Sequence, residues 1–141
     1  MSAAQYDVVG IGNAIVDVIA RADDAFLAAK KLAKGAMTLI DEAQADALYD
    51  AMGPGTESSG GSAANTMAGI ASLGGKGAFF GKVKNDQLGK VFAHDIRAIG
   101  VAFDSKPATD GPATARCLIF VTPDAQQIGR ASCRERVYVL V

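Results

Sequence analysis

Short β-branched runs alternate with helical segments along most of this chain, and this alternation constrains the fold more than any other feature. The runs YDVVGIG, IVDVIARA, MTLI and TARCLIFV are typical of strands, whereas DDAFLAAKKLAKG, DEAQADALYDAM and NDQLGKVFAHDIRAIG are typical of helices. This order predicts an α/β fold with a largely parallel sheet. Strands near 17–21, 36–40, 55–59 and 113–121 do not each lead into a long helix, so they could form a smaller second sheet over the edge of the first.

Two of the expected helices have clear local signals. Asp41 and Gln44 form a capping-box pattern at the start of one helix, which GPG at 53–55 ends. The helix after Asp86 is strongly periodic, and we expect its His94 to be solvated rather than catalytic. The apolar face of that helix comprises Leu88, Val91, Phe92, Ile96 and Ile99, and the polar face comprises Lys90, His94 and Arg97.

Composition limits the classes of function. The 141 residues suffice for one ordinary domain, half are apolar, and the net charge of -1 gives no reason to expect nucleic acid. Polar residues interrupt the apolar N-terminal stretch and no basic segment precedes it, so we expect no signal peptide, no membrane span and a cytoplasmic location. Cys117 and Cys133 form no Cys-x-x-Cys pattern and the chain has one histidine, so neither a disulfide framework nor a metal site is predicted.

Three glycine-rich stretches resemble nucleotide-binding loops to different degrees. GIGNAI has the first two glycines of the dinucleotide fingerprint, but Ile15 occupies the third position and would obstruct close helix packing. In GIASLGGKG, Gly75 stands where a Walker loop has its lysine, so this stretch is not a P-loop. The third stretch, SSGGSAANT at 58–66, would let the main chain approach a ligand, and a helix beginning near Ser62 would point its N–H groups to the same place.

Polar side chains associated with this third stretch indicate a ligand with several hydroxyl groups. The Asn65 amide both donates and accepts hydrogen bonds, as a hydroxyl does. Asn13 and Asp17 interrupt an apolar segment at the expected carboxyl edge of a sheet, where polar groups are costly unless something pairs with them. Together with Gly61, these residues predict a site for a polyhydroxyl compound. The alternative is that Gly60 and Gly61 only make a turn and that Asn65 caps the helix locally.

Four blocks of the sequence, in order and spacing, resemble the N-terminal motifs of the ribokinase-like (PfkB) family of carbohydrate and nucleoside kinases, and are most similar to adenosine kinases and related sugar kinases. The blocks are VVGIGNAIVDVIA, SSGGSAANTMAGIASLGG, GKVKNDQLGKVFAHDIRAIGV and TARCLIFVTPDAQ. The resemblance runs from about Tyr6 to Gln126. It implies the N-terminal portion of a three-layer α/β/α fold with a small β-sheet lid, with the strand near 7–12 central and residues 1–127 forming the substrate side and the lid.

The resemblance also implies roles for individual residues, and two residues depart from the family pattern. Asn13 and Asp17 would bind the sugar hydroxyls, Gly60, Gly61, Ser62 and Asn65 would enclose the sugar, and Cys117 would belong to the lid sheet. Met67 stands where the family usually has Ala, Ser or Thr, and Lys84 replaces the glycine common before NDxxG. These departures affect the subfamily assignment more than the family assignment.

The activity that the resemblance implies is ATP-dependent phosphorylation of a hydroxyl of a small-molecule sugar or nucleoside, with Mg²⁺. A fructokinase or a 2-keto-3-deoxygluconate-type kinase is the alternative among enzymes, and a non-catalytic sugar- or nucleoside-binding module is the alternative outside them. The family places its base and anion hole on a Gly-Ala-Gly-Asp-like segment, which this sequence lacks. We therefore expect no catalytic residue within this chain, an ATP site beyond its end, and no activity from the fragment alone.

The end of the chain differs in charge from the rest. Three of the six arginines lie in residues 128–141, where the net charge is +2, against -3 for residues 1–127. Such a tail can be a nucleic-acid-binding arm. However, IGRASCRERV is similar to the in-frame translation of a common sequencing-adapter oligonucleotide, so we interpret 128–141 as a non-native tail. We expect this tail to lack family-like packing, with Arg130, Arg134 and Arg136 not docked in a groove of the body.

Overall fold

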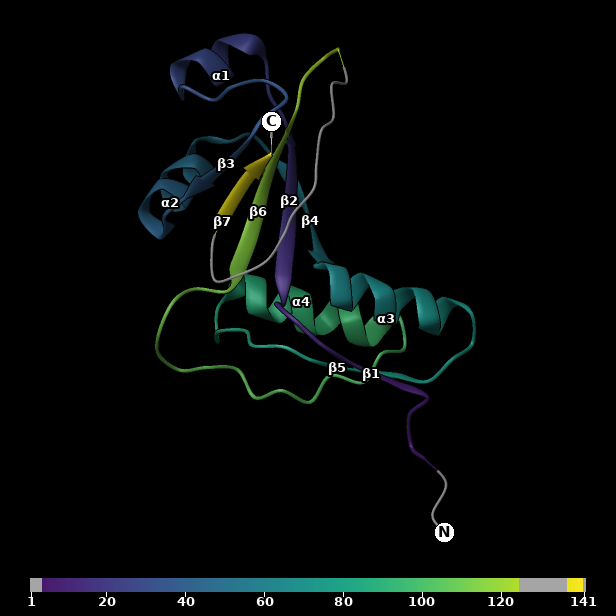
Figure 1. The fold of residues 1–141 in the computed structure, drawn as a ribbon. Coiled ribbons are helices and arrows are strands. Elements are labelled where there is room, and N and C mark those ends of the chain that lie inside the picture. The colour runs from purple at the N-terminus through teal and green to yellow at the C-terminus, as the bar shows by residue number, and fades with distance from the viewer. Residues whose placement is uncertain (1–3, 125–136, 141) are drawn as a thin grey trace. The chain divides into compact units, whose positions relative to one another are not determined.

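The computed structural model describes residues 4–124 and 137–140, which belong to two compact units (Figure 1). Unit 1 comprises Met1–Val16 and Ser58–Thr114, and unit 2 comprises Asp17–Glu57 and Ala115–Val141. The elements in chain order are β1 (Val8–Ile11), β2 (Ile15–Arg21), α1 (Asp24–Ala29), β3 (Met37–Ile40), α2 (Glu42–Ala51), β4 (Gly55–Gly60), α3 (Ser62–Ser72), β5 (Gly77–Phe80), α4 (Gln87–Ala98), β6 (Ala115–Val121) and β7 (Val137–Leu140). Within the described ranges, no helix is long and apolar enough to cross a membrane.

Unit 1 is built on a parallel pair of strands. β1 and β5 pair in parallel, with Val8 opposite Gly77 and Ile11 opposite Phe80. The helices α3 and α4 lie over the same face of this pair (Figure 1). A parallel pair needs a crossover connection, and the chain between β1 and β5 supplies it with α3 as its last helix. The parallel α/β pattern expected from the sequence is therefore present.

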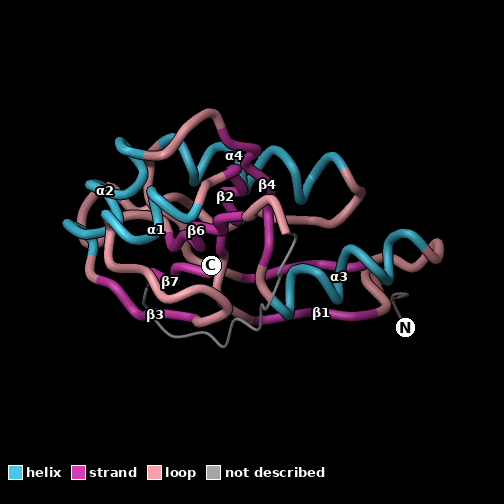
Figure 2. Tube along the Cα trace, turned by 90° about the horizontal axis from the view of Figure 1, so that it is seen from above, coloured by secondary structure: helices cyan, strands magenta, loops and turns pink. Residues whose placement is uncertain are grey.

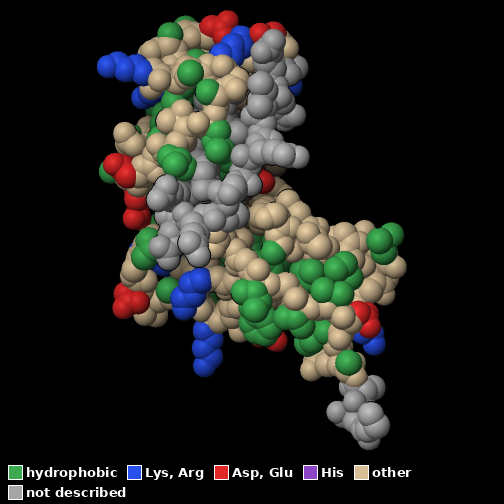
Figure 3. Space-filling view, viewed as in Figure 1, with side chains coloured by type: hydrophobic (Ala, Val, Ile, Leu, Met, Phe, Trp, Pro, Cys, Tyr) green, Lys and Arg blue, Asp and Glu red, His purple; other side chains and the backbone are tan. Residues whose placement is uncertain are grey.

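The other side of the β1–β5 pair exposes apolar side chains. Val9 is 51% exposed, Ile11 81% and Phe80 53%, and hydrophobic side chains gather over this part of unit 1 in Figure 3. Among the described residues, β5 is the only partner strand of β1, so the strand expected to be central lies at an edge here. The described part of unit 1 thus contains the sheet and one helical layer of a three-layer α/β unit.

Glycines let α3 lie directly on the strands. A Cβ on Gly12 would lie 2.8 Å from the Cβ of Ala63, and a Cβ on Gly10 would lie 3.0 Å from Cγ of Met67. Met67 is 3% exposed, and its thioether also lies over Gly77. Met67, which departs from the family pattern, is therefore accommodated by Gly10 on β1 and Gly77 on β5.

The helix α4 buries the face that its periodicity predicts. Phe92 is fully buried and Ile96 is 1% exposed. The ring of Phe92 contacts those of Phe79 and Phe103, with centroids 5.7 and 5.4 Å apart. Ile99 was expected on the same face, but it is 46% exposed because the helix ends one residue before it. These aromatic contacts form the core of unit 1.

Asp86 connects the start of α4 to the segment before β6. Its Oδ1 accepts hydrogen bonds from the main-chain N–H of Gly89 and from Oγ1 of Thr114, both at 2.7 Å, and its Oδ2 accepts one from the Thr114 N–H at 2.9 Å. Thr114 Oγ1 in turn accepts from the Lys84 N–H at 2.9 Å. A Cβ on Gly89 would lie only 2.1 Å from the Lys84 carbonyl oxygen. Glycine is therefore required at the end of NDxxG.

Unit 2 contains the second sheet that the sequence predicts. Its strand order is β3-β7-β6-β2-β4, with β6 and β7 parallel and β3 and β7 antiparallel. The helices α1 and α2 lie together beside this sheet (Figure 2). Phe26 of α1 packs against Phe120 of β6, with ring centroids 5.2 Å apart, and Arg116 of β6 forms an ion pair with Asp46 of α2. One face of β6 is therefore covered by both helices.

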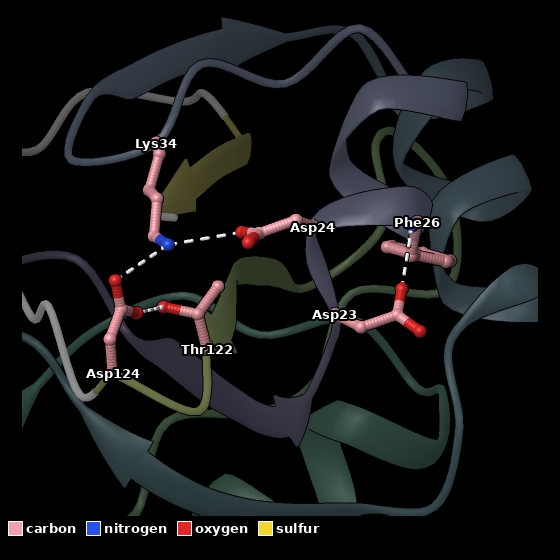
Figure 4. Close-up of polar contacts among 6 residues, drawn as sticks. All are labelled: Asp23, Asp24, Phe26, Lys34, Thr122 and Asp124. Carbon is pink, nitrogen blue, oxygen red and sulfur yellow. Dashed lines mark hydrogen bonds and ion pairs between the residues drawn. The ribbon is translucent and has the colours of Figure 1, made fainter.

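The helix α1 is shorter than its sequence predicts, whereas the start of α2 is as expected. The helical pattern continues to Gly35, but α1 ends at Ala29 and Lys31 has a φ of 57°. Lys34 folds back instead and contacts Asp24 at 3.0 Å and Asp124 at 2.7 Å (Figure 4). Lys34, which lies beyond the end of α1, thus links the first residue of the helix to Asp124. At α2, both hydrogen bonds of the predicted capping box are present.

Part of the expected non-native tail is paired in the second sheet. Residues 137–140 form β7 between β3 and β6. The segment VYVL has high β-propensity, and ladder hydrogen bonds come from the main chain, so any such segment can fill this place. Arg130, Arg134, Arg136 and Cys133 lie outside the described residues.

A first prediction concerns Gly89. Replacing it with alanine places a methyl group against the Lys84 carbonyl, so Gly89→Ala should destabilise the protein by roughly 1–3 kcal/mol. The matched control is Gly69→Ala in α3, where no atom lies within 4 Å of the added Cβ and alanine should stabilise by up to about 1 kcal/mol. Urea unfolding of both variants measures the difference. Equal effects of the two changes would contradict the steric role of Gly89.

A second prediction concerns acid stability. Burial alone would raise the pKa of Asp86, but hydrogen bonds from Thr114 and Gly89 and the charge of Lys84 hold its pKa below the ordinary 3.8. The carboxylate therefore contributes stability above about pH 3.8 that is lost as the pH falls through its folded-state pKa. Asp86→Asn should lower the free energy of unfolding near pH 6, and its difference from wild type should shrink below pH 3.8, measured by denaturant unfolding across pH. A difference that is independent of pH would argue against this role.

Candidate functional site

The turn between β4 and α3 is built around Gly61. Its φ of 97° lies in the left-handed region, and a Cβ there would lie 2.7 Å from the main-chain oxygen of Asn13. The Asn65 N–H donates to the Gly61 carbonyl at 2.8 Å and begins the helix. Conformation and packing therefore both require glycine at 61, and the turn brings the main chain of Asn13 beside the start of α3.

The first turn of α3 keeps hydrogen-bonding capacity. Gly61 is its N-cap residue, and no side chain caps the helix there. The main-chain N–H groups at such an end carry partial positive charge and favour ligand oxygen atoms. Asn65 is exposed, and among the described residues its amide makes no hydrogen bond, so it does not cap the helix locally. Of the two interpretations of this stretch, local capping by Asn65 is not what the structure shows.

Asp17 and Cys117 lie on neighbouring strands of the second sheet, β2 and β6. Burial raises the pKa of the half-buried Asp17 carboxyl, and no group among the described residues donates a hydrogen bond to it. Cys117 is fully buried, and burial, with a smaller effect of the Asp17 charge, raises the pKa of its thiol to about 12. The thiol is therefore protonated and unreactive at neutral pH. Burial disfavours the ionised form of the Asp17 carboxyl group. A ligand that donates a hydrogen bond to the carboxylate would therefore stabilise that form.

The structure divides the predicted site residues into two sets. Asn13, Gly60, Gly61, Ser62 and Asn65 lie in unit 1, and Asp17 and Cys117 lie in unit 2. In unit 1, the contact between Gly61 and Asn13 brings together segments that are far apart in the sequence. In unit 2, the charge of Asp17 contributes to the raised pKa of the Cys117 thiol. These two residues are also far apart in the sequence and lie on neighbouring strands.

Asp95 is a site-associated residue that the sequence analysis did not identify. It lies on α4, and its Oδ2 accepts a hydrogen bond from the Ser59 N–H at 3.0 Å, immediately before the glycine turn. Its Oδ1 lies 3.2 Å from Nδ1 of His94, whose side chain is 81% exposed, as expected. Ser59 is 36 residues away in sequence and contributes only a main-chain group, so no local pattern marks this contact.

A shallow depression of about 600 Å³ lies on unit 1 beside α4. It includes Lys84 and Arg97 but none of the predicted site residues. Arg97 is exposed, as expected, and its guanidinium donates two hydrogen bonds to the Phe103 carbonyl, at 2.9 and 2.6 Å. Lys84 Nζ donates to the Gly111 carbonyl at 2.7 Å. Both cations thus bind neighbouring main-chain carbonyl groups.

Among the described residues, no three His, Cys, Asp or Glu side chains gather closely enough to hold a metal ion. The candidate polar groups are amides and main-chain N–H groups in unit 1 and a half-buried carboxylate in unit 2. Groups of these kinds can bind and orient a ligand with several hydroxyls.

Known proteins resemble this chain over most of its length. The adenosine kinase from Sinorhizobium meliloti is 55% identical, and the match covers 97% of this chain and 39% of that protein with a TM-score of 0.75. A probable sugar kinase from Rhizobium etli is 51% identical over 96% of this chain and 38% of that one, also with a TM-score of 0.75. The probable chloroplastic fructokinase-6 of Arabidopsis thaliana is 35% identical over 68 residues, which are 48% of this chain and 18% of that protein.

These matches bear on both fold and family. The chain spans less than two fifths of the length of each of the two solved structures, and it corresponds to the N-terminal portion of a ribokinase-like α/β fold, as the sequence predicts. The sequence profile of the pfkB family carbohydrate kinases matches residues 7–131, which is most of the chain. The chain therefore belongs to the pfkB family of carbohydrate kinases.

Proposed function

We propose that this chain is the substrate-side part of a kinase that transfers the γ-phosphoryl group of ATP to a hydroxyl of a nucleoside or sugar, with adenosine as the first candidate acceptor. The observation that carries the proposal is the 55% identity to an adenosine kinase along 97% of the chain. The match covers nearly all of both units, and therefore includes the segments in which the proposed acceptor-site residues lie.

The proposed acceptor site uses the residues that the sequence analysis selected. Asp17 would accept hydrogen bonds from acceptor hydroxyls, because burial penalises its charge and no described group donates to it. Asn13 and Asn65 would each donate and accept. The turn at Gly60 and Gly61 would let the main chain approach the ligand, since no Cβ intervenes. Ser62 begins the helix at this point, and Cys117 would serve only as packing beneath Asp17.

The phosphoryl donor requires groups beyond those described. We infer that the complete enzyme uses ATP with Mg²⁺, which would neutralise charge on the transferred phosphoryl group. No candidate metal centre is found among residues 4–124 and 137–140, and the sequence has no Gly-Ala-Gly-Asp-like segment. The base and the anion hole would accordingly come from polypeptide outside residues 1–141, and this chain alone would bind an acceptor without phosphorylating it.

A sugar kinase acting on fructose or 2-keto-3-deoxygluconate is the second candidate. It is favoured by the 51% identity to a probable sugar kinase and by the 35% identity to a probable fructokinase. A non-catalytic binding module is the third candidate, and it predicts a genuine stop codon near residue 141. Sequencing the locus beyond the codon for Gln126 also tests whether residues 128–141 are a non-native tail.

A third prediction tests the function directly. Residues 1–126 joined to the remaining C-terminal portion of the Sinorhizobium meliloti adenosine kinase should phosphorylate adenosine faster than ribose or fructose, measured as ADP release with ATP and Mg²⁺. The chain of residues 1–141 should release no more ADP than a control without acceptor. Activity of that chain alone would show that its catalytic groups lie within it. A soluble but inactive chimera would favour the binding module, and preference for fructose would favour the sugar kinase.

A fourth prediction concerns Asp17. In the chimera, Asp17→Ala removes a charged acceptor from the ligand and should weaken acceptor binding about tenfold, measured by calorimetric titration. Asp50→Ala, which removes an exposed carboxylate from α2 in the same unit, is the matched control and should leave the titration unchanged. Identical isotherms for wild type and Asp17→Ala would remove Asp17 from the site.

A further inference from the structure

The glycine turn has little intrinsic rigidity. Gly60 and Gly61 are adjacent, and each glycine has access to a wider range of backbone conformations than any other residue. A ligand that binds to such a turn must bear the entropic cost of ordering it unless the protein has already done so. The question is therefore which contacts hold the turn before a ligand arrives.

One end of the turn is held by its own helix. The Gly61 carbonyl accepts the Asn65 N–H at 2.8 Å, and the Gly61 Cα packs against the main-chain oxygen of Asn13. These contacts involve the second glycine. They do not reach Ser59, the residue before the two glycines, which lies in β4 beside β2 in the second sheet.

The other end lies in β4 and is also held by Asp95. The Ser59 N–H donates to Asp95 Oδ2 at 3.0 Å. Ser59 is the last residue before the glycines, so this bond and the Gly61 contacts bracket the turn. Because the acceptor is ionised, the bond is stronger than a neutral one.

The helix that carries Asp95 is itself well fixed. Phe92 and Ile96, which flank Asp95 on α4, are at most 1% exposed. Arg97 donates two hydrogen bonds to the Phe103 carbonyl, and Asp86 anchors the start of the helix. A side chain on such a scaffold holds its partner more accurately than a side chain on a loop.

We propose that Asp95 is a positioning residue, whose carboxylate holds the Ser59 main chain so that the Gly60–Gly61 turn is already in its ligand-binding conformation. The inference rests on the proposed function for the identity of the ligand. Asp95 need not touch the acceptor, because it acts through the turn. Its Oδ1 faces His94, which leaves Oδ2 for Ser59.

Three variants in the full-length chimera test the proposal. Asp95→Ala removes the acceptor of the Ser59 N–H, Asp95→Asn keeps an oxygen that can accept it, and Lys90→Ala changes an exposed residue of the same helix as the matched control. Asp95→Ala should raise the KM for adenosine about tenfold, with the KM for ATP unchanged. Asp95→Asn and Lys90→Ala should remain within about twofold of wild type.

Hydrogen exchange provides a readout that does not depend on the ligand. Mass spectrometry of peptides covering residues 57–62 should show faster exchange in Asp95→Ala than in wild type, Asp95→Asn or Lys90→Ala. Unchanged exchange in Asp95→Ala would overturn the anchoring role. Faster exchange with an unchanged KM for adenosine would show that the turn needs no anchor, which also overturns the proposal.

Two further outcomes separate this proposal from others. An equal rise in the KM for adenosine and for ATP, or equal damage by Asp95→Ala and Asp95→Asn, would indicate a general structural role and overturn the positioning role. If the wild-type chimera phosphorylates and binds none of adenosine, ribose and fructose, the proposed function fails. The exchange data then still decide whether Asp95 anchors the turn.

Discussion

The hydrogen bonds to the carboxylate of Asp86 are the interaction on which the rest of unit 1 depends. They cap α4 through Gly89 and tie it to Thr114, and Thr114 is bonded in turn to Lys84. With α4 held in this way, Phe92 meets Phe79 and Phe103 in the core. The same helix carries Asp95, whose carboxylate accepts a hydrogen bond from Ser59 just before the glycine turn. The Asp86 cap and the anchor of the candidate ligand turn therefore belong to one helix.

Glycine determines how closely the main chain segments of unit 1 approach one another. Gly12 and Gly10 leave room for Ala63 and Met67 of α3, and Gly61 leaves room for the Asn13 carbonyl. A methyl group at Gly12 or Gly61 would come within 3.0 Å of Ala63 Cβ or of the Asn13 main-chain oxygen, whereas at Gly10 it would meet the flexible side chain of Met67. The glycine-rich stretches that resemble nucleotide loops in the sequence are thus used in part for packing, and the candidate ligand turn results from that packing.

Unit 2 carries a charged side chain on each of two neighbouring strands, Arg116 on β6 and Asp17 on β2, and only Arg116 has a charged partner among the described residues. Arg116 is 7% exposed, pairs with Asp46 and lies over the ring of Tyr49, while its Nε has no partner among the described residues. The ion pair therefore offsets only part of the cost of burying the Arg116 guanidinium. It contributes more to fixing α2 on the sheet than to the stability of the fold. Asp17 lacks such a partner, which is the physical reason to expect a ligand beside it.

Periodicity, caps and turn residues are local signals, and they sufficed to predict the α/β class, β1, the strands of the second sheet other than β7, the capping box at Asp41 and the buried face around Phe92. The same patterns selected Gly61 as a residue with special backbone needs. No local pattern gives the ion pair between Lys34 and Asp124 or the hydrogen bond between Asp95 and Ser59, which form only in the folded protein. These features depend on partners distant in sequence, and the partner is often a main-chain group that every residue carries, so no residue type reveals it in advance.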